Sequence, residues 1–269
     1  MVTGGASGIG RAMAEAFVGE GMRVVLADVE APRLEEAAEA LRAKGARVLA
    51  VRCDVSRGDE VEALAERAWS ELGRVDVVCN NAGVASGGPL WLHTAADWEW
   101  VLGVNLWGVI HGVRVFVPRM LQQGGEGHVV NTASMAGLVT GPFMGMYNVS
   151  KQGVVALSET LHKDLALAGA SVHVSVLCPG FVRTGIADAD RNRPGGTGAG
   201  ALTGHPMQDL ARAAVAGGVD PALVGAAVVD AIRSQRFYVL THREMLAAFR
   251  ERATDILEGR NPSTQVQFV

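Results

Sequence analysis

Short apolar runs alternate with longer amphipathic segments along most of this chain. This alternation is typical of repeated strand–helix–strand units, in which helices cover both faces of a mostly parallel sheet. We therefore predict an α/β fold with strands at residues 23–28, 47–53, 75–80, 127–133, 172–178 and 236–241, and helices at 9–20, 32–44, 59–72, 97–122, 147–168, 220–234 and 243–258.

The 269 residues suffice for one large α/β domain with a substantial core. The 24 Lys and Arg residues nearly balance the 28 Asp and Glu residues, and no run of five basic residues occurs. This balance argues against nucleic acid and against an anionic membrane surface as partners. No uninterrupted apolar stretch reaches the roughly 18 residues that a membrane helix requires. We therefore predict a soluble protein without a membrane partner.

The three cysteines, Cys53, Cys79 and Cys178, are scattered along the chain without paired spacing. They indicate neither a disulfide framework nor a zinc site built on cysteines. Five of the seven histidines, at 93, 111, 128, 162 and 205, likewise lack the spacing of metal ligands, so we expect structural or exposed side chains and no metal. A reducing cytoplasm fits this cysteine usage best.

One segment, residues 188–218, breaks the alternation. It contains the glycine-rich stretch RPGGTGAGALTG and shows no apolar periodicity, which predicts a mobile loop. A tolerated surface insertion is one interpretation, but long loops in compact domains are often active-site lids, and we favour the lid. The predicted organisation is thus a single domain over 1–269 with a lid near 186–218.

A glycine-rich turn, TGGASGIG, occupies residues 3–10 and places Gly4, Gly8 and Gly10 in a G-x-x-x-G-x-G spacing. Glycines permit a tight turn, a close approach of the backbone to phosphate, and close packing of the following helix. The free N–H groups of that helix would attract a pyrophosphate. The spacing alone is weak evidence, because glycine-rich turns without a ligand are common.

Asp28 ends the first predicted strand, 18 residues after the last glycine of the turn. A carboxylate there can accept hydrogen bonds from an adenosine ribose and would repel a 2′-phosphate. Ser7 occupies the turn position where a basic residue could stand, so NAD is favoured over NADP. Two alternatives stay open: Asp28 is a solvated strand end, or Arg11 or Arg33 folds inward to accept a phosphate.

Two further motifs follow predicted strands. CDV at 53–55 would let Asp54 and Val55 meet an adenine edge, and NNAG at 80–83 either forms a simple turn or borders the same ligand. Because the carboxyl ends of parallel strands face the ligand crevice, we favour a binding role for both.

The stretch YNVSK places Tyr147 and Lys151 four residues apart, on one face of a predicted helix. Ser134 ends the preceding strand, 13 residues before the tyrosine, so the three side chains can converge. A phenol with a pKa of about 10 is a poor base near neutrality. A lysine ammonium about 4 Å away, at an effective dielectric near 20, would favour the phenolate by about 4 kcal/mol, or roughly three pKa units.

The order of the motifs resembles that of the short-chain dehydrogenase/reductase family, in its NAD-preferring type, over nearly the whole chain. The motifs are TGGASGIG, Asp28, CDV, NNAG, VNLWG, NTAS, YNVSK and CPGFVRT. The resemblance implies a Rossmann-type, doubly wound sheet of seven mostly parallel strands. It also implies direct hydride transfer between a nicotinamide and a carbinol carbon, without a metal.

The resemblance also implies roles for single residues. Tyr147 would be the general acid/base, Lys151 would lower its pKa and hold the nicotinamide ribose, and Ser134 would bind the substrate oxygen. Asn105 would hold a water in a proton relay, although an amide that satisfies a helix kink is compatible with the same position. The implied cofactor residues are Gly4, Ser7, Gly8, Ile9, Gly10, Asp28, Asp54, Val55, Asn81, Ala82, Gly83, Tyr147, Lys151, Pro179, Gly180, Val182 and Thr184.

The expected substrate is a bulky apolar secondary alcohol or ketone. No Arg or Lys is placed to hold a carboxylate, apart from Arg191 and Arg193 of the lid. One branch of this family contains dehydrogenases of lignin-derived aryl ethers and of terpenoid or alicyclic alcohols. The chain also looks similar to that branch in residues 97–121 and in the stretch RNRP. The expected pocket walls, about half of them ordinary core, are Met135, Leu138, Val139, Phe143, Met144, Met146, Phe181 and Ile186.

The family also suggests how the chain assembles. Its members usually form homotetramers or homodimers through the helices at 97–122 and 147–168, so we expect one of these states. Trp98, Trp100 and Trp107 lie on the first of these helices, and we assign them to the core or to a subunit interface rather than to a ligand site.

Only Met1 and Val2 precede the glycine-rich turn. Family members carry a further segment there that forms a first strand between the second and fourth. We therefore expect a stub in that place, and we favour a natural start upstream of the assigned one over a central strand that has become shorter. Two other functions stay open: an NADPH-dependent carbonyl or 3-oxoacyl reductase, and a non-catalytic dinucleotide-binding sensor.

Overall fold

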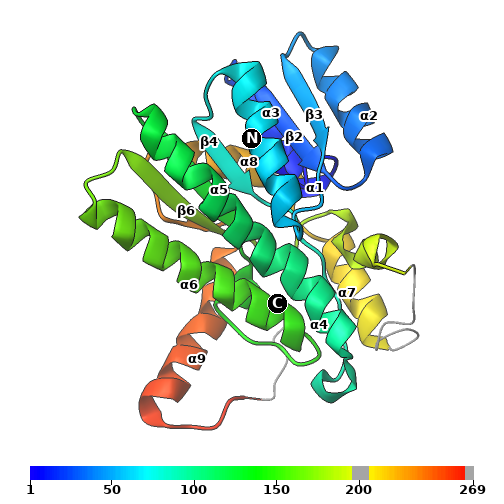
Figure 1. The fold of residues 1–269 in the computed structure, drawn as a ribbon. Coiled ribbons are helices and arrows are strands. Elements are labelled where there is room, and N and C mark those ends of the chain that lie inside the picture. Colours follow the sequence, from blue (N-terminus) through cyan, green and yellow to red (C-terminus); the bar gives the residue numbers. More distant parts are fainter. Residues whose placement is uncertain (196–205, 264–269) are drawn as a thin grey trace.

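The computed structural model describes residues 1–195 and 206–263, which fold around one seven-stranded parallel sheet (Figure 1). The strand order is β3-β2-β1-β4-β5-β6-β7. This order confirms the predicted doubly wound, Rossmann-type sheet. The strands are β1 (Val2–Thr3), β2 (Val24–Asp28), β3 (Val48–Arg52), β4 (Val77–Asn80), β5 (Gly127–Thr132), β6 (Val172–Cys178) and β7 (Tyr238–Leu240).

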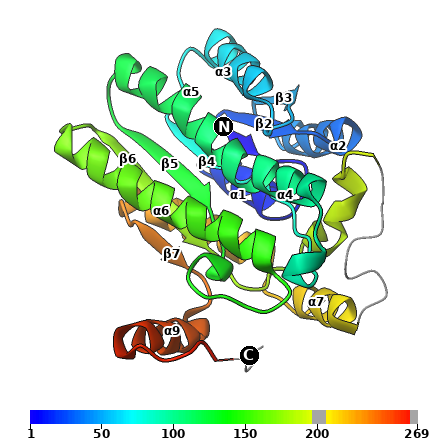
Figure 2. The ribbon, with the colours of Figure 1, turned by 60° about the horizontal axis from the view of Figure 1, so that its bottom comes forward.

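Helices cover both faces of the sheet (Figures 1 and 2). Apolar side chains of α1, α2 and α8 pack on one face, and those of α3, α5 and α6 pack on the other. The helices are α1 (Gly8–Gly19), α2 (Ala31–Arg42), α3 (Gly58–Leu72), α4 (Ala95–Leu102), α5 (Gly108–Gln123), α6 (Gly145–Leu167), α7 (Pro206–Ala216), α8 (Pro221–Arg233) and α9 (Leu246–Glu258).

The first strand is the predicted stub, and it lies between β2 and β4. Val2 stands opposite Leu26 on one side and Cys79 on the other. The ammonium group of Met1 is buried and donates to the Val77 carbonyl over 2.8 Å, and burial lowers its pKa. β1 thus places the glycine-rich turn at the centre of the carboxyl edge of the sheet.

The single helix predicted at 97–122 is interrupted. A π-helical turn, Gly103–Trp107, separates α4 from α5, and it turns Asn105 fully into the interior. By length and composition alone, the segment Ala95–Gln123 could cross a membrane. In the fold it packs on the sheet instead, where Phe116 and Met120 are buried core residues.

The prediction of a loop over 188–218 was wrong in part. A short helical segment, Gly185–Asn192, and the helix α7 lie within or beside it, while residues 196–205 lie outside the described residues. Pro206 at the first position of α7 and the alanines that follow favour a helix there. The adjacent glycines hid this signal, because they removed any apolar periodicity from the window.

His128 makes the stability of the fold depend on pH. It is buried in β5, and its Nε2 lies 2.8 Å from Ser175 Oγ, which itself donates to the Arg236 carbonyl. Burial lowers the pKa of His128 to about 4, and His173 adds to the effect. Since the unfolded value is about 6.5, the unfolded chain binds the proton first, so stability is present above pH 6.5 and is lost as the pH falls towards 4.

We expect His128 to account for a loss of up to about 3 kcal/mol of unfolding free energy between pH 7 and pH 4. Urea unfolding of the wild type and of His128→Gln at pH 7, 5.5 and 4 measures this loss. The variant should show a flatter pH dependence, whereas the exposed His162→Gln should follow the wild type. Equal slopes for His128→Gln and the wild type would refute the assignment.

Candidate active site

A cavity of about 1040 Å³ lies along the carboxyl edge of the sheet. It is bordered by the glycine-rich turn, the ends of the central strands, the loop after β5, the segment after β6, and α9. Every predicted cofactor residue except Gly10 lines it, as does Ser134, whereas Asn105 does not. The structure therefore brings these predicted cofactor residues, which are spread from Gly4 to Thr184 in the sequence, to the wall of one cavity.

The glycine-rich turn has a backbone that only glycine accommodates. Gly4 and Gly8 have φ angles of 64° and 54°. A Cβ atom at Gly4 would lie 2.9 Å from Ala82 Cα, and one at Gly8 would lie 3.0 Å from Thr184 Cγ2. A Cβ atom at Gly10 would come within 2.1 Å of the Gly4 carbonyl oxygen. Gly10 thus lets the first turn of α1 close on the loop, and it does not face the cavity.

Asp28 ties this turn to the end of β2. Its carboxylate accepts hydrogen bonds from the backbone N–H groups of Ala6 and Glu30, both over 3.1 Å. Burial raises the pKa of Asp28, and these bonds oppose the rise. Arg11 and Arg33 are engaged with Glu15 and Glu30 respectively. Asp28 is therefore a positioned, half-buried acceptor on the cavity wall rather than a solvated strand end.

Ser134, Tyr147 and Lys151 converge where the cavity meets α6. Tyr147 and Lys151 are buried, with the lysine Nζ 5.6 Å from the centre of the tyrosine ring. Lys151 donates to the Thr132 carbonyl over 2.9 Å. Ser134 Oγ accepts from the Ala136 N–H. These bonds fix the two groups that flank the phenol.

The electrostatics of the three residues follow from their burial. Burial raises the pKa of Tyr147, and a hydrogen bond with Ser134 opposes this. Burial lowers the pKa of Lys151 to about 8, while Cys178 acts in the opposite direction. At pH 7 the lysine is therefore an ammonium ion beside a neutral phenol, an arrangement that can stabilise a phenolate when the proton leaves.

Asn105 supports the site from within the π-helical turn. Its Oδ1 accepts from the Val84 N–H over 2.8 Å, while its Nδ2 donates to the Val84 carbonyl and to Ser150 Oγ. A Cβ atom at Gly83 would lie 3.4 Å from Asn105 Oδ1 and 3.5 Å from Lys151 Nζ. The side chain thus serves the distorted helix, as one of the two interpretations expected, and the relay role stays a prediction.

The wall predicted for the substrate is observed in most of its parts. Leu138 and Met146 do not line the cavity. Met146 is fully buried in the core cluster that contains Val84 and Trp100. Trp100 is a buried core residue, as expected, and it also borders the cavity. The predicted residues that line the wall are Met135, Val139, Phe143, Met144, Phe181 and Ile186.

Sequence reasoning missed one side of the cavity, which α9 supplies. Ala248, Arg252 and Ile256 line it at intervals of four residues, so they share one face of the helix. The only signal in the sequence was the helical pattern at 243–258, which did not reveal what this face would contact.

The segment 185–194 is held over the cavity by ion pairs. Arg191 pairs with Glu30 over 2.8 Å, which joins the segment to the end of β2. Arg193 pairs with Asp97 at the start of α4, and its guanidinium lies 5.2 Å from the centre of the Trp100 ring. The two arginines that we considered as carboxylate ligands are therefore already matched by carboxylates of the protein.

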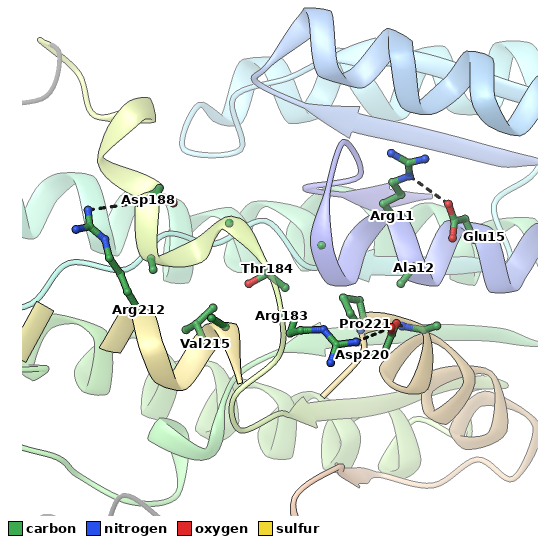
Figure 3. A pocket seen from close by; sticks show the side chains of 15 residues that line it. Arg11, Ala12, Glu15, Arg183, Thr184, Asp188, Arg212, Val215, Asp220 and Pro221 are labelled. Atoms are coloured by element: carbon green, nitrogen blue, oxygen red, sulfur yellow. Dashed lines mark hydrogen bonds and ion pairs between the residues drawn. The ribbon is translucent and has the colours of Figure 1, made fainter. Parts of the chain in front are cut away.

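A second, neighbouring pocket of about 800 Å³ lies between α1, α7 and the segment after β6 (Figure 3). Each of its three arginines faces a carboxylate. Arg11 pairs with Glu15, and the other pairs are Arg183 with Asp220 and Arg212 with Asp188. These internal pairs match the charges of the pocket, and we assign it no ligand.

Within the described residues, no three His, Cys, Asp or Glu side chains lie close enough to hold a metal ion. Cys53, Cys79 and Cys178 are buried thiols, and burial raises the pKa of each to about 12. They are therefore poor nucleophiles near neutrality.

Comparisons with known proteins agree with this geometry. The family model described as short chain dehydrogenase matches residues 1–194. A short chain dehydrogenase/reductase from Burkholderia phymatum, solved in complex with NAD, superposes with a TM-score of 0.95 at 47% identity, covering 99% of this chain and 96% of that one. The 1-deoxy-11-beta-hydroxypentalenate dehydrogenase of Streptomyces arenae is 40% identical over 95% of this chain and 86% of its own length. The CLA biosynthesis dehydrogenase/reductase of Lactiplantibacillus plantarum is 31% identical, over 98% and 95%.

Proposed function

The chain belongs to the short-chain dehydrogenase/reductase family, and we propose that it is an NAD-dependent oxidoreductase that interconverts a bulky apolar secondary alcohol and its ketone. One observation carries the proposal. Ser134, Tyr147 and Lys151 converge on the same cavity that the glycine-rich turn and Asp28 border. A dinucleotide site and an acid/base site thus share one space, as hydride transfer to or from a carbonyl requires.

The residues present fit NAD. The turn offers backbone N–H groups at the N-terminus of α1, with glycines where a Cβ atom would collide. Asp28 would accept the adenosine ribose hydroxyls, Asp54 and Val55 would border the adenine, and Thr184 would border the carboxamide. When bound, the nicotinamide supplies the site that accepts or donates the hydride.

Tyr147 acts on the proton of the substrate oxygen in this proposal. In the oxidation direction its phenolate accepts the hydroxyl proton, and in reduction its phenol returns that proton to the carbonyl oxygen. Ser134 orients the same oxygen through its hydroxyl. Lys151 stabilises the phenolate with its charge and hydrogen-bonds the nicotinamide ribose, and Asn105 holds a water that links the lysine to solvent.

The mostly apolar wall supports a bulky apolar substrate. The named relatives include a dehydrogenase of a hydroxypentalenate, which agrees with a hydroxyl on a large substrate skeleton. We further propose a cytoplasmic homotetramer or homodimer formed through α5 and α6. Trp107 and Val149, which lie at these helices, are about half exposed and offer apolar surface for such an interface.

Two measurements test the proposal. The purified chain is titrated with NAD and NADP, and turnover of aryl, alicyclic and terpenoid secondary alcohols is then followed by the absorbance of the reduced nicotinamide. Binding of NAD together with turnover supports a dehydrogenase. Turnover with NADPH and ketones alone would favour the reductase alternative. Binding without turnover of any of these alcohols or ketones would favour a sensor.

Asp28→Asn should change the cofactor preference. The carboxylate would repel a 2′-phosphate, and such like-charge contacts cost several kcal/mol. We expect the ratio of kcat/KM for NAD over NADP to fall by about 100-fold, whereas the exposed Asp59→Asn should leave it unchanged. An unaltered ratio in Asp28→Asn would show that this carboxylate does not select the cofactor.

A further inference from the structure

Arg252 brings a cation to the substrate side of the cavity. Its side chain comes from the inner face of α9 and donates to the Leu138 carbonyl over 3.2 Å and to Gln152 Oε1 over 3.4 Å. Leu138 follows the Ser134 loop, and Gln152 follows Lys151 in α6. The guanidinium is therefore held between the two segments that carry the acid/base residues.

Within the described residues, the hydrogen-bond acceptors of Arg252 are neutral oxygens, and this separates it from the other arginines on the wall. Arg191 pairs with Glu30, Arg193 with Asp97, and Arg260 with Asp255. A guanidinium carries five donors in a planar fork, and two long hydrogen bonds leave most of them for another acceptor. Arg252 is half-buried, so an anion bound to it would be only partly screened by water.

Asp255, the carboxylate three residues after Arg252 on the cavity side of α9, has another arginine as its partner. Asp255 is matched by Arg260 over 2.9 Å. Glu251 is exposed at the rim of the cavity. Met245, beside Gly180 at the nicotinamide end, precedes Arg252 by two helical turns, or about 10 Å of helix axis. Tyr147 and Arg252 line the same cavity, so one extended ligand could contact both.

From these contacts we infer that the substrate is a hydroxy acid, with an apolar skeleton between its hydroxyl and a carboxylate that Arg252 binds. The fork of an arginine matches the two oxygens of a carboxylate. The inference rests on the proposed function and deepens it, since it names the polar group that the apolar walls leave unassigned. Arg252 is thus a specificity-determining residue, and Arg191 and Arg193 are not.

Matched acid and ester probes test this inference. The probes are 4-(1-hydroxyethyl)benzoate and 4-hydroxycyclohexanecarboxylate, each beside its methyl ester, with saturating NAD. The variants are Arg252→Gln, Arg252→Lys and the control Arg250→Gln, whose arginine is exposed on the same helix outside the cavity wall. Binding of 4-acetylbenzoate and of its methyl ester in the presence of NADH, measured by calorimetry, gives a second readout that needs no turnover.

We expect the wild type to prefer acids over esters, and Arg252→Gln to lose roughly 10- to 100-fold in kcat/KM for the acids alone. Arg252→Lys should fall between the two, and Arg250→Gln should match the wild type. Equal losses for acid and ester would mean that Arg252 only anchors α9, and would overturn the inference. So would a wild type that neither oxidises nor binds the acids in preference to the esters. A different result would contradict the proposed function itself: the wild type would then oxidise neither the acids nor neutral secondary alcohols.

Discussion

Tyr147→Phe should lower kcat/KM for alcohol oxidation by about 1000-fold while NAD binding stays within a few fold of the wild type. In the proposed function the buried phenol carries the proton, and Ser134 alone could not replace it because an alcohol is a much weaker acid. Phenylalanine keeps the ring and removes only the oxygen, so the packing of α6 is preserved.

The chain contains its own control for this substitution. Its one other tyrosine, Tyr238, lies in β7 with its hydroxyl 2.7 Å from Glu159, away from the cavity. Tyr238→Phe should retain full turnover. Activity is followed by absorbance of the reduced nicotinamide, NAD binding by titration, and folding by the melting temperature. Loss of less than tenfold in Tyr147→Phe would remove this residue from the proton step.

The fold and the cofactor edge could be predicted from the sequence because their signals are local. Asp28 and the NNAG turn each follow an apolar strand, and parallel strands end at a common edge. The positive φ angles at Gly4 and Gly8 likewise demand the residue type that the motif shows. At these positions the backbone conformation requires a particular residue type, so the residue type in the sequence predicts the conformation.

The rest of the site depends on contacts between segments far apart in the chain. Arg252 meets Leu138 across 114 positions, and no pattern within α9 announces that partner. Arg193 likewise pairs with Asp97 and stacks on Trp100, which both lie more than 90 positions away in the sequence. The sequence analysis considered Arg191 and Arg193 as carboxylate ligands and did not consider Arg252, because its place on the cavity wall depends on this distant contact.

The π-helical turn at Asn105 shows a different limit. Its residues, GVNLW, are compatible with an ordinary helix, so periodicity predicts one continuous segment. Within the turn, the buried amide of Asn105 finds partners in the Val84 backbone and in Ser150. Burial of a polar group requires such partners, and only the tertiary fold supplies them.

Lys151→Met should raise the apparent pKa of alcohol oxidation by about two units and lower kcat/KM at pH 7 by about 100-fold. At 5.6 Å and an effective dielectric near 20, the ammonium stabilises a charge on the tyrosine ring by about 3 kcal/mol. Removing that charge leaves burial, which raises the pKa of Tyr147, opposed by the hydrogen bond with Ser134. The proportion of phenolate at pH 7 falls accordingly.

The pH profile between 6 and 10 distinguishes this electrostatic role from a purely structural one. Because the pKa of Lys151 is about 8, the wild-type lysine carries its charge below that pH and loses it above, so the gap between wild type and variant should narrow as the pH rises. Lys151→Arg should retain most of the low apparent pKa, and the exposed Lys163→Met should leave the profile unchanged. A Lys151→Met profile with a wild-type apparent pKa and a uniformly lower rate would mean that the lysine positions the cofactor and does not tune the phenol.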